Sequence, residues 1–510
     1  MKFNKLVVFA CMGLAVALMV RCGGNGADKG NSKQVVITSS AADIKKGELL
    51  AAQYCQSCHQ LPHPSLLDKA TWRNNVLPVM GLYLGTKYHV SDSILNTQLD
   101  NMTYLPQTPV IDSLEWRYII NYYVNKAPGQ LPVAQRAAPL KELPFFKIIP
   151  APAEWVSSSV LTSYVKIDDS VKPHRLIVVD GVTNKVIVLD NKVSTINSST
   201  MSGAIVNMVF QKDGIVATTL GKDLWANDAK NGNVKEINID NTGKVAVAER
   251  LIVDRLGRPV ATTITDLNQD GQPDYLVAQF GKMTGKLSWF ELPEGKKKEH
   301  VLRDKPGCVK TVIEGHNIWA LFAQGDEGLF KYTNDGKGNF AEKRVLSFPP
   351  SYGSTYFELV DINSDGLKDV VYTCGDNGDY SQIPKPYHGI YIYLNTGNDT
   401  FVSKYFYPMN GCYKAIVKDF DRDGKLDIAA ISQFPGGANR NESFIYLKGK
   451  GGLNFQPYTL PPGTPLSNAL TVDAGDIDGD GKTDLLIGNG FVGLNKADKQ
   501  PLFIVLKNIK

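Results

Sequence analysis

The sequence predicts a multidomain protein in which a small all-α domain precedes an all-β seven-bladed propeller. Three observations lead to this prediction. The length of 510 residues exceeds that of one ordinary domain. Residues 43–127 have helical apolar spacing, and residues 155–510 are short β-branched runs between Gly, Asn and Asp turns, with an internal repeat. The expected segments are an export signal at 1–22, a flexible tether at 23–42, the helical domain at 43–127, a proline-rich linker at 128–154 and the propeller at 155–510.

The first 22 residues are typical of a bacterial export signal. Lys2 and Lys5 precede an apolar run, 6–20, which has secretory length and is short for a membrane span. Cys22 follows, before small residues, and this pattern resembles a lipoprotein signal in which that cysteine is lipidated. Arg21 stands where the pattern has a small residue, so an ordinary signal peptide or an uncleaved anchor stays open. The resemblance implies export to the periplasm or cell surface, with a lipid anchor in the bacterial envelope, at the outer membrane.

The net charge of the chain argues against nucleic acid as a partner. The formal net charge is +4, and three of these charges belong to the export segment. The remaining chain is close to neutral and has no electrostatic footprint for nucleic acid.

Two helices are expected within 43–127. Residues 45–54 are good helix formers, and 112–124 open with cap-type residues and place Trp116, Ile119, Ile120 and Tyr123 on one face. Prolines then recur through the linker, which predicts an extended connector, since proline interrupts both helices and central strands.

Cys55-Gln56-Ser57-Cys58-His59 is a C-x-x-C-H motif. Two thiols at this spacing can each form a thioether to a haem vinyl group, and the adjacent histidine can ligate the iron. A redox C-x-x-C would require a βαβ context, and half of a zinc site would require a further Cys/His pair nearby; the sequence has neither. We therefore predict one covalent haem c at Cys55, Cys58 and His59.

The surroundings of the motif resemble the class I-like cytochrome c family over residues 43–127. Gly47 and Tyr54 lie in the helix leading into the motif, and the aromatic-rich helix at 114–124 closes the segment. The resemblance implies a small all-α cytochrome c domain and electron transfer.

The sixth iron ligand has two main candidates. Met80 lies in a W-x-x-x-V-L-P-x-M pattern that resembles short cytochrome domains, and it is favoured over Met102, whose spacing is more like that of other small cytochromes c. His63 is too close to His59 for the distal side, and His89 is a minor candidate. Thioether ligation would raise the reduction potential relative to bis-histidine ligation.

Four segments of the C-terminal part share one nine-residue pattern, starting at Asp266, Asp361, Asp419 and Asp476. The first interval is about twice the others, and degenerate units fit near 165–169, 205–214 and 309–315, which brings the count to seven. Radially arranged four-stranded units of this length describe a propeller.

Each pattern has Asp or Asn at positions 1, 3, 5 and 9 and glycine at position 6, which suits a hard cation such as Ca²⁺. An EF-hand is excluded, because position 12 is never Glu and strand-type runs follow. The segments resemble FG-GAP/VCBS repeat propellers, which implies up to four structural Ca²⁺ ions. The predicted ligands are Asp266, Asn268, Asp270 and Asp274; Asp361, Asn363, Asp365 and Asp369; Asp419, Asp421, Asp423 and Asp427; and Asp476, Asp478, Asp480 and Asp484.

Other features of the C-terminal part have a structural interpretation. Cys308, Cys374 and Cys412 are odd in number and are expected to be buried rather than paired. Gly307-Cys308-Val309-Lys310 and Gly411-Cys412-Tyr413-Lys414 occupy matching places in two repeats, which favours packing. An insert at 375–389 is either a long surface turn, which we favour, or a ligand-binding loop.

The leading functional hypothesis is a tethered electron-transfer protein whose calcium-binding propeller binds a redox partner protein or substrate. A dehydrogenase with a catalytic propeller and an adhesin or glycan-binding module are the alternatives. No hydrolytic constellation stands out, so an electron-transfer or binding protein is favoured over a self-contained enzyme.

Overall fold

The structure is a computed structural model that describes residues 39–88, 90–91, 105–212, 214–221, 224, 227–293, 296–376, 378, 382–436, 440–492 and 497–510, without the side chains of 246–249 and 492. The export signal and most of the tether therefore lie outside the described residues. None of the helices in the described part of the chain is both long and apolar enough to cross a bilayer.

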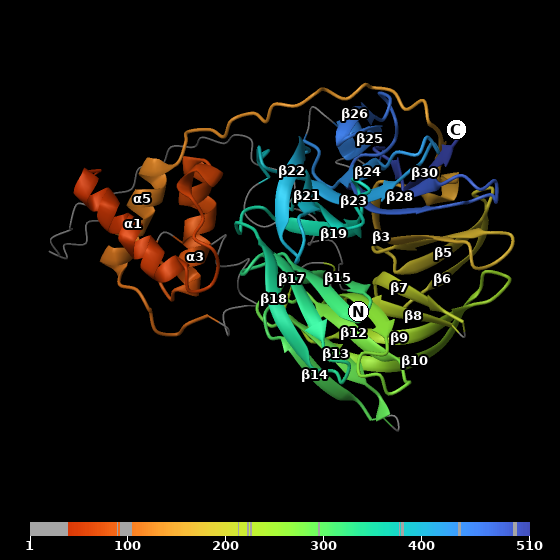
Figure 1. Ribbon diagram of the computed structural model, residues 1–510, viewed down its shortest axis with the longest axis horizontal. Helices are drawn as coiled ribbons and strands as arrows, with labels where there is room; N and C mark the ends of the chain where they lie inside the picture. Colours follow the sequence, from red (N-terminus) through yellow and green to blue (C-terminus); the bar gives the residue numbers. More distant parts are fainter. Residues whose placement is uncertain are drawn as a thin grey trace, which may run out of the picture.

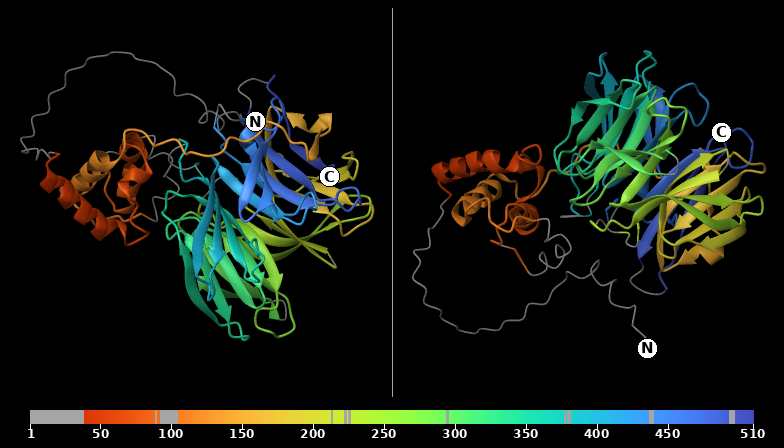
Figure 2. Two further views of the ribbon diagram at one scale, coloured as in Figure 1. Left: turned by 45° about the horizontal axis from the view of Figure 1, so that its top comes forward. Right: turned by 90° about the horizontal axis from the view of Figure 1, so that it is seen from below.

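The N-terminal part is a small cluster of helices beside the sheets, drawn in red and orange (Figures 1 and 2). Its elements are α1 (Ala41–Cys55), the 3₁₀ turn η1 (Pro64–Leu66), α2 (Lys69–Thr71), the π-helical turn η2 (Trp72–Val76), α3 (Leu77–Tyr83) and α5 (Ser113–Lys126). Ser40 and Asp112 cap α1 and α5, because their side chains accept hydrogen bonds from backbone N–H groups of the first turn. Trp116, Ile119 and Tyr123 are buried, as the sequence predicted for one face of α5.

Helices α1 and α5 pack closely against each other at Gly47. A Cβ added there would lie 2.1 Å from the Tyr118 carbonyl oxygen and 2.7 Å from Tyr122 Cβ, both in α5. We expect Gly47→Ala to push the helices apart and to destabilise the cluster by about 3 kcal/mol, as overpacking does. Hydrogen exchange of the α1 and α5 amides would measure this loss, and Gln53→Ala, an exposed position of the same helix, should change little. Equal protection in Gly47→Ala would contradict the packing argument.

The rest of the described chain is mainly antiparallel sheet. Five separate four-stranded sheets each run in chain order. Their strands are β7 (Ile205–Gln211), β8 (Gly214–Thr219), β9 (Gly232–Ile239) and β10 (Val245–Leu256); β11 (Pro259–Thr265), β12 (Asp274–Gln279), β13 (Lys286–Glu291) and β14 (Lys298–Arg303); β15 (Cys308–Glu314), β16 (Asn317–Phe322), β17 (Gly328–Asn334) and β18 (Phe340–Ser347); β19 (Ser354–Val360), β20 (Asp369–Cys374), β21 (Gly389–Asn395) and β22 (Phe401–Pro408); and β23 (Cys412–Lys418), β24 (Asp427–Ser432), β25 (Phe444–Gly451) and β26 (Asn454–Thr459). A 3₁₀ turn, η6 (Arg440–Ser443), precedes β25.

One eight-stranded sheet joins the two ends of the repeat region. It contains β1 (Phe146–Pro150), β3 (Ser159–Asp168), β4 (Arg175–Asp180), β5 (Lys185–Asp190), β6 (Thr195–Thr200), β27 (Ala469–Gly475), β28 (Asp484–Val492) and β30 (Phe503–Asn508). Strand β1 lies at its edge and pairs with β30. A two-stranded sheet of β2 (Val156–Ser157) and β29 (Gln500–Pro501) and a 3₁₀ turn, η4 (Ala153–Trp155), complete this part.

The core of the sheet region lies between neighbouring sheets. Val179 of β4 and Ala217 of β8 share one buried cluster, and Ile392 of β21 and Ala430 of β24 share another. In Figure 1, β3, β7, β15, β19 and β23 surround the centre, and the strands that follow each of them in its sheet lie further out. This arrangement is β-propeller-like, with burial supplied by stacking between repeats.

The predicted fold class, a small all-α cytochrome c domain plus an all-β seven-bladed propeller, is wrong as stated. Among the described residues only α1, α3 and α5 are helices of seven residues or more, with 15, 7 and 14 residues, so there is no sizeable all-α domain. Prolines break the segment between α1 and α5. Among the described residues the sheets are five of four strands, one of eight and one of two, not seven separate blades. Repeat counting missed this because β28 runs on and pairs with β3 through 490–492.

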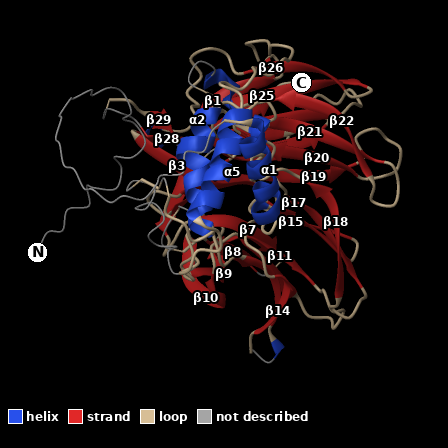
Figure 3. Ribbon diagram, turned by 90° about the vertical axis from the view of Figure 1, so that its left-hand side faces the viewer, coloured by secondary structure: helices blue, strands red, loops and turns tan. Residues whose placement is uncertain are grey.

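The helical cluster touches the sheet region, as Figure 3 shows with the helices in front of the strands. Tyr387 Oη donates to the Leu66 carbonyl oxygen at 2.9 Å, and Ser347 Oγ donates to Gln60 Oε1 at 3.5 Å. Arg136, between helices and sheets, donates to Tyr407 Oη at 3.1 Å and pairs with Glu442. The C-x-x-C-H segment is therefore close to this contact.

Candidate functional site

The C-x-x-C-H motif lies at the C-terminal end of α1. Cys55 is the last residue of the helix and is half-buried, Cys58 is exposed, and His59 is half-buried. Ser57 Oγ donates to the Tyr54 carbonyl oxygen at 2.7 Å, and Tyr54 Oη donates to Glu115 Oε2 of α5 at 2.8 Å. These bonds attach the turn of the motif to both helices.

His59 is oriented by a single backbone contact. Its Nδ1 lies 2.9 Å from the Gln60 carbonyl oxygen. Because a carbonyl can only accept, Nδ1 carries the proton and Nε2 keeps its lone pair. Metal-ligating histidines are commonly held in this way by their second nitrogen.

The thiols lack the features of a redox pair. Burial, followed by the neighbouring Cys58, raises the pKa of Cys55 to about 11. A redox-active C-x-x-C needs a lowered thiol pKa. Among the described residues, the groups of three or more His, Cys, Asp or Glu side chains that could hold a metal are all aspartates elsewhere, so a zinc tetrahedron at this turn is not formed by these residues.

Met80 lies in α3 and packs, half-buried, against the same apolar cluster as Cys55. Met102 and His89, the other candidates for the sixth ligand, lie outside the described residues. His63 caps η1: its Nδ1 accepts from the Ser65 N–H at 3.3 Å, which gives this histidine a structural role.

Trp116 is a site residue that the sequence did not mark as functional. Its indole Nε1 is buried and has no acceptor among the described residues. The indole lies against Gly81, next to Met80, because a Cβ at Gly81 would be 3.1 Å from Nε1. A buried donor without an acceptor is rare and unfavourable. The Trp116 N–H therefore fits a bound group that offers an acceptor oxygen.

The four aspartate-rich loops share one backbone geometry. The residue at position 1 accepts from the N–H of the position-6 glycine in every loop, at 2.9, 2.9, 2.9 and 2.7 Å. Each glycine has positive φ, and those of the first three loops have open space where a Cβ would lie, so conformation rather than crowding requires glycine there. A strand begins at position 9 of each loop, as predicted from the sequence, at Asp274, Asp369, Asp427 and Asp484.

The ninth aspartates are buried and already hydrogen-bonded. Each accepts from the N–H at position 2 of its own loop, at 2.8, 3.0, 3.1 and 2.9 Å. Burial is the largest cause of the raised pKa at all four, which reaches about 6 at Asp274 and Asp484. A cation beside these carboxylates would favour their ionised form.

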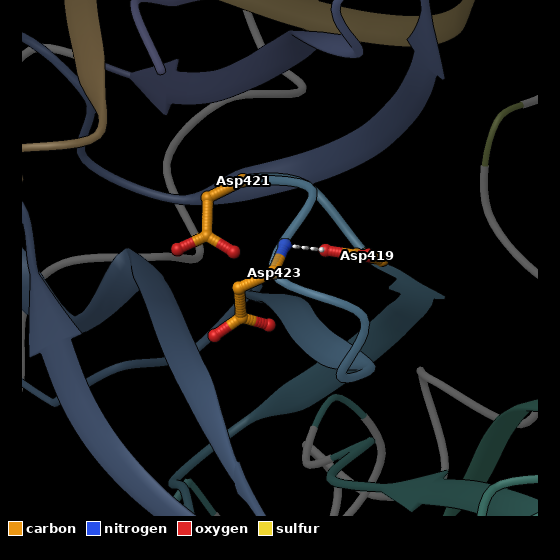
Figure 4. Close-up of side chains that lie close together, drawn as sticks. All are labelled: Asp419, Asp421 and Asp423. Carbon is orange, nitrogen blue, oxygen red and sulfur yellow. Dashed lines mark hydrogen bonds between the residues drawn. The ribbon is translucent and has the colours of Figure 1, made fainter.

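The third and fourth loops bring carboxylates together most closely. Asp419, Asp421 and Asp423 form one group that could hold a metal ion, and Asp476, Asp478 and Asp484 form another. Figure 4 shows the first group, with Asp419 accepting from the Asp423 N–H at 3.1 Å. In the first and second loops, Asn268 and Asn363 place an amide beside the position-5 aspartate. The oxygen-rich donor sets fit Ca²⁺.

A lysine that the sequence did not identify enters the third loop. Lys448 of β25 is 6% exposed, and its Nζ lies 2.8 Å from Asp421 Oδ1, 2.7 Å from Asp423 Oδ2 and 3.4 Å from Asp427 Oδ1. Lys507 of β30 pairs with Asp478 of the fourth loop, but its side chain is 36% exposed. The third loop therefore has an ammonium group where a cation would bind.

Cys308, Cys374 and Cys412 are buried free thiols, as predicted, and burial raises the pKa of each. The insert at 375–389 is described only in part. Its Tyr387 stacks on Tyr352 with ring centroids 4.8 Å apart. Through its bond to the Leu66 carbonyl oxygen, Tyr387 takes part in the contact with the helical cluster.

Residues 419–487, which include the third and fourth loops, match the family of FG-GAP-like repeats. No curated protein matches the chain. Among solved structures, the N-terminal domain of Nup159 is similar, with a TM-score of 0.43 and 9% identity over 74% of this chain and 99% of that one. An S. cerevisiae Dbp5 complex with Nup159, Gle1, IP6 and ADP gives 0.41 and 9%, over 74% and 99% of the two chains. A luciferin-regenerating enzyme gives 0.37 and 10%, over 71% and 96%. The match at 419–487 confirms the predicted resemblance to FG-GAP repeats and indicates a binding module of the β-propeller type.

Proposed function

We propose that this chain is an exported c-type haem protein that passes single electrons, with the propeller-like region as the part that binds its partner. The observation that carries the proposal is His59, whose Nδ1–H is fixed by the Gln60 carbonyl while Nε2 stays free, one residue after the second cysteine of the motif. The raised pKa of Cys55 and the unpartnered Trp116 N–H support it.

Four residues would hold the haem in the proposed site. Cys55 and Cys58 would attach the haem, His59 Nε2 would ligate the iron, and Met80 would supply a thioether ligand. Bound haem supplies one-electron redox chemistry. The chain itself fixes the histidine tautomer, excludes water with the apolar cluster around Trp116 and Met80, and offers a donor to an acceptor on the bound group.

Electron transfer is tested by asking which partner protein reduces or oxidises the haem. The protein, matured in an exporting host that attaches c-type haem, is mixed with the electron-transfer proteins of its own envelope, and haem reduction is followed by absorbance. Reduction or oxidation by one of them supports the proposal. Failure of all of them to change the haem spectrum, while dithionite reduces it, would reject electron transfer but keep haem attachment.

The sixth ligand gives a separate prediction. We expect Met80→Ala to lose the near-infrared methionine–iron band and to lower the reduction potential, because a thioether ligand raises it. Met102→Ala is the matched control and should keep the band. Loss of the band in Met102→Ala alone would assign the ligand to that residue instead.

Export and anchoring at Cys22 are part of the same proposal. A lipid at this position would hold the protein in the bacterial envelope, on the periplasmic or outer surface. Metabolic labelling with palmitate, compared between the natural chain and Cys22→Ser, tests the anchor. Equal labelling of the two would reject it.

We further propose that the first, second and fourth aspartate loops bind structural Ca²⁺, whereas the Lys448 ammonium group takes the place of an ion in the third. Their shared position-1 to position-6 bond gives each loop the same turn, which brings the carboxylates together. Chelation should therefore lower the melting temperature without changing the haem spectrum.

A second function, binding of a glycan or protein surface, is favoured by the FG-GAP-like match at 419–487. Here the haem would not be required. Glycan-array binding that persists after Cys55→Ala and Cys58→Ala would support this function over electron transfer.

A further inference from the structure

Three neighbouring inner strands carry a matched set of side chains. Each of β15, β19 and β23 has a register shift near its start, between Cys308 and Lys310, between Ser354 and Tyr356, and between Cys412 and Lys414. Lys310, Tyr356 and Lys414 therefore occupy the same place in three successive repeats. The two Gly-Cys-x-Lys segments of the sequence are the flanking members of this set.

Both ammonium groups lie beside one aromatic ring. Lys310 Nζ is 3.4 Å from the centroid of the Tyr356 ring, and Lys414 Nζ is 5.2 Å from it. The ring face attracts a cation, but the two like charges repel each other. Figure 1 shows that their strands lie at the centre of the sheet region.

The acidic groups nearby are already engaged. Glu358 accepts from Tyr356 Oη and from the Val417 N–H, each at 3.0 Å. Asp473 pairs with Lys166 at 3.1 Å and accepts from the Ile167 N–H at 2.8 Å. Three lysines, Lys166, Lys310 and Lys414, therefore lie near two carboxylates that already have partners.

The two lysines differ in their partners. Lys414 Nζ donates to the Val472 carbonyl oxygen at 2.7 Å. Lys310 has no hydrogen bond or ion pair with any described residue; its ammonium meets only the rings of Tyr356 and Phe357. Burial, and then the charge of Lys414, lowers the pKa of Lys310 to about 7, and burial lowers the pKa of Lys414 as well. Lys310 and Lys414 are half-buried, and an anion beside them would offset the repulsion between their two ammonium groups.

We propose that the axis of the sheet region binds a small oxyanion with two negative charges, of the phosphate, sulfate or dicarboxylate type, between Lys310 and Lys414. Both ammonium groups lie within 5.2 Å of the centroid of the Tyr356 ring, so two donors of positive charge are close together at the axis. The site is separate from the aspartate loops and from the C-x-x-C-H turn, so it does not depend on the function proposed for them.

The experiment is calorimetric titration of the full chain with inorganic phosphate and, separately, with sulfate, against sodium chloride at equal ionic strength. We expect saturable binding of one anion per chain, weakened about 10- to 100-fold in Lys310→Met, since a charge-assisted hydrogen bond is lost. Lys310→Arg should keep most of the affinity. Lys418→Met, an exposed position of the same strand as Lys414, is the matched control and should bind like the natural chain.

Two results would overturn the proposal. One is heat of dilution only for both anions with the natural chain. The other is equal loss of binding in Lys310→Met and Lys418→Met, which would show general charge screening. If Lys310→Met does not fold, Lys414→Gln takes its place in the comparison, with circular dichroism as the check of folding.

Discussion

A variant in which Cys55 and Cys58 are both alanine is expected to carry no covalent haem when it matures in an exporting host that attaches c-type haem. The natural chain should keep its Soret absorbance in the protein after acid–acetone extraction, because thioether bonds survive this treatment and a histidine–iron bond does not. The expected loss is complete, since both covalent bonds would come from these two thiols. Absorbance of the extracted protein, normalised to its concentration, measures the effect.

Ser57→Ala is the matched control, because Ser57 is exposed and lies between the two cysteines. It should keep the haem, although it loses the 2.7 Å bond to the Tyr54 carbonyl oxygen. Extractable Soret absorbance in the natural chain, or covalent haem in the double alanine variant, would reject attachment at these thiols. The FG-GAP-like repeat would be unaffected by either result.

The sequence was most informative where a signal is local. The nine-residue loops, the strands that start at their ninth residues and the burial of Cys308 and Cys412 all follow from patterns within a few residues, and the structure agrees with them. The FG-GAP-like assignment has the same origin. Haem attachment and the ligand roles of the loop residues stay predictions, because no bound group tests them.

The features that sequence reasoning missed depend on register between strands. The joining of the first and last repeats needs the pairing of Gly490 with Leu161, which no local pattern encodes. Lys448 reaches the third loop only because Leu447 lies opposite Ile428 across β24 and β25. Trp116 was predicted as an apolar core residue, and its unpartnered N–H emerges only from the packing against Gly81.

The pairing between strands places a different side chain beside each of the four loops, so the loops are expected to differ in their affinity for calcium. The second residue of the strand that follows each loop pairs with a residue on the neighbouring strand. The residue after that partner is Glu291 for the first loop, Leu394 for the second, Lys448 for the third and Lys507 for the fourth. Only Lys448 is both nearly buried and within 3.4 Å of three aspartates of its loop. A calcium ion in the third loop must displace this ammonium group and leave it buried without a partner, which is strongly unfavourable.

Exchanging Leu394, beside the second loop, with Lys448, beside the third, should therefore move a calcium site from the second loop to the third. We expect Lys448→Leu to gain one bound Ca²⁺ per chain and Leu394→Lys to lose one, with affinity at the altered loop changed by about 100-fold. The double variant should bind the same number of ions as the natural chain, which serves as the matched control for disturbed packing. Equilibrium dialysis with metal analysis counts the ions, and melting curves with and without chelator report their effect on stability. Unchanged stoichiometry in both single variants, with the fold intact by circular dichroism, would show that Lys448 is a mobile neighbour of the loop rather than its internal cation.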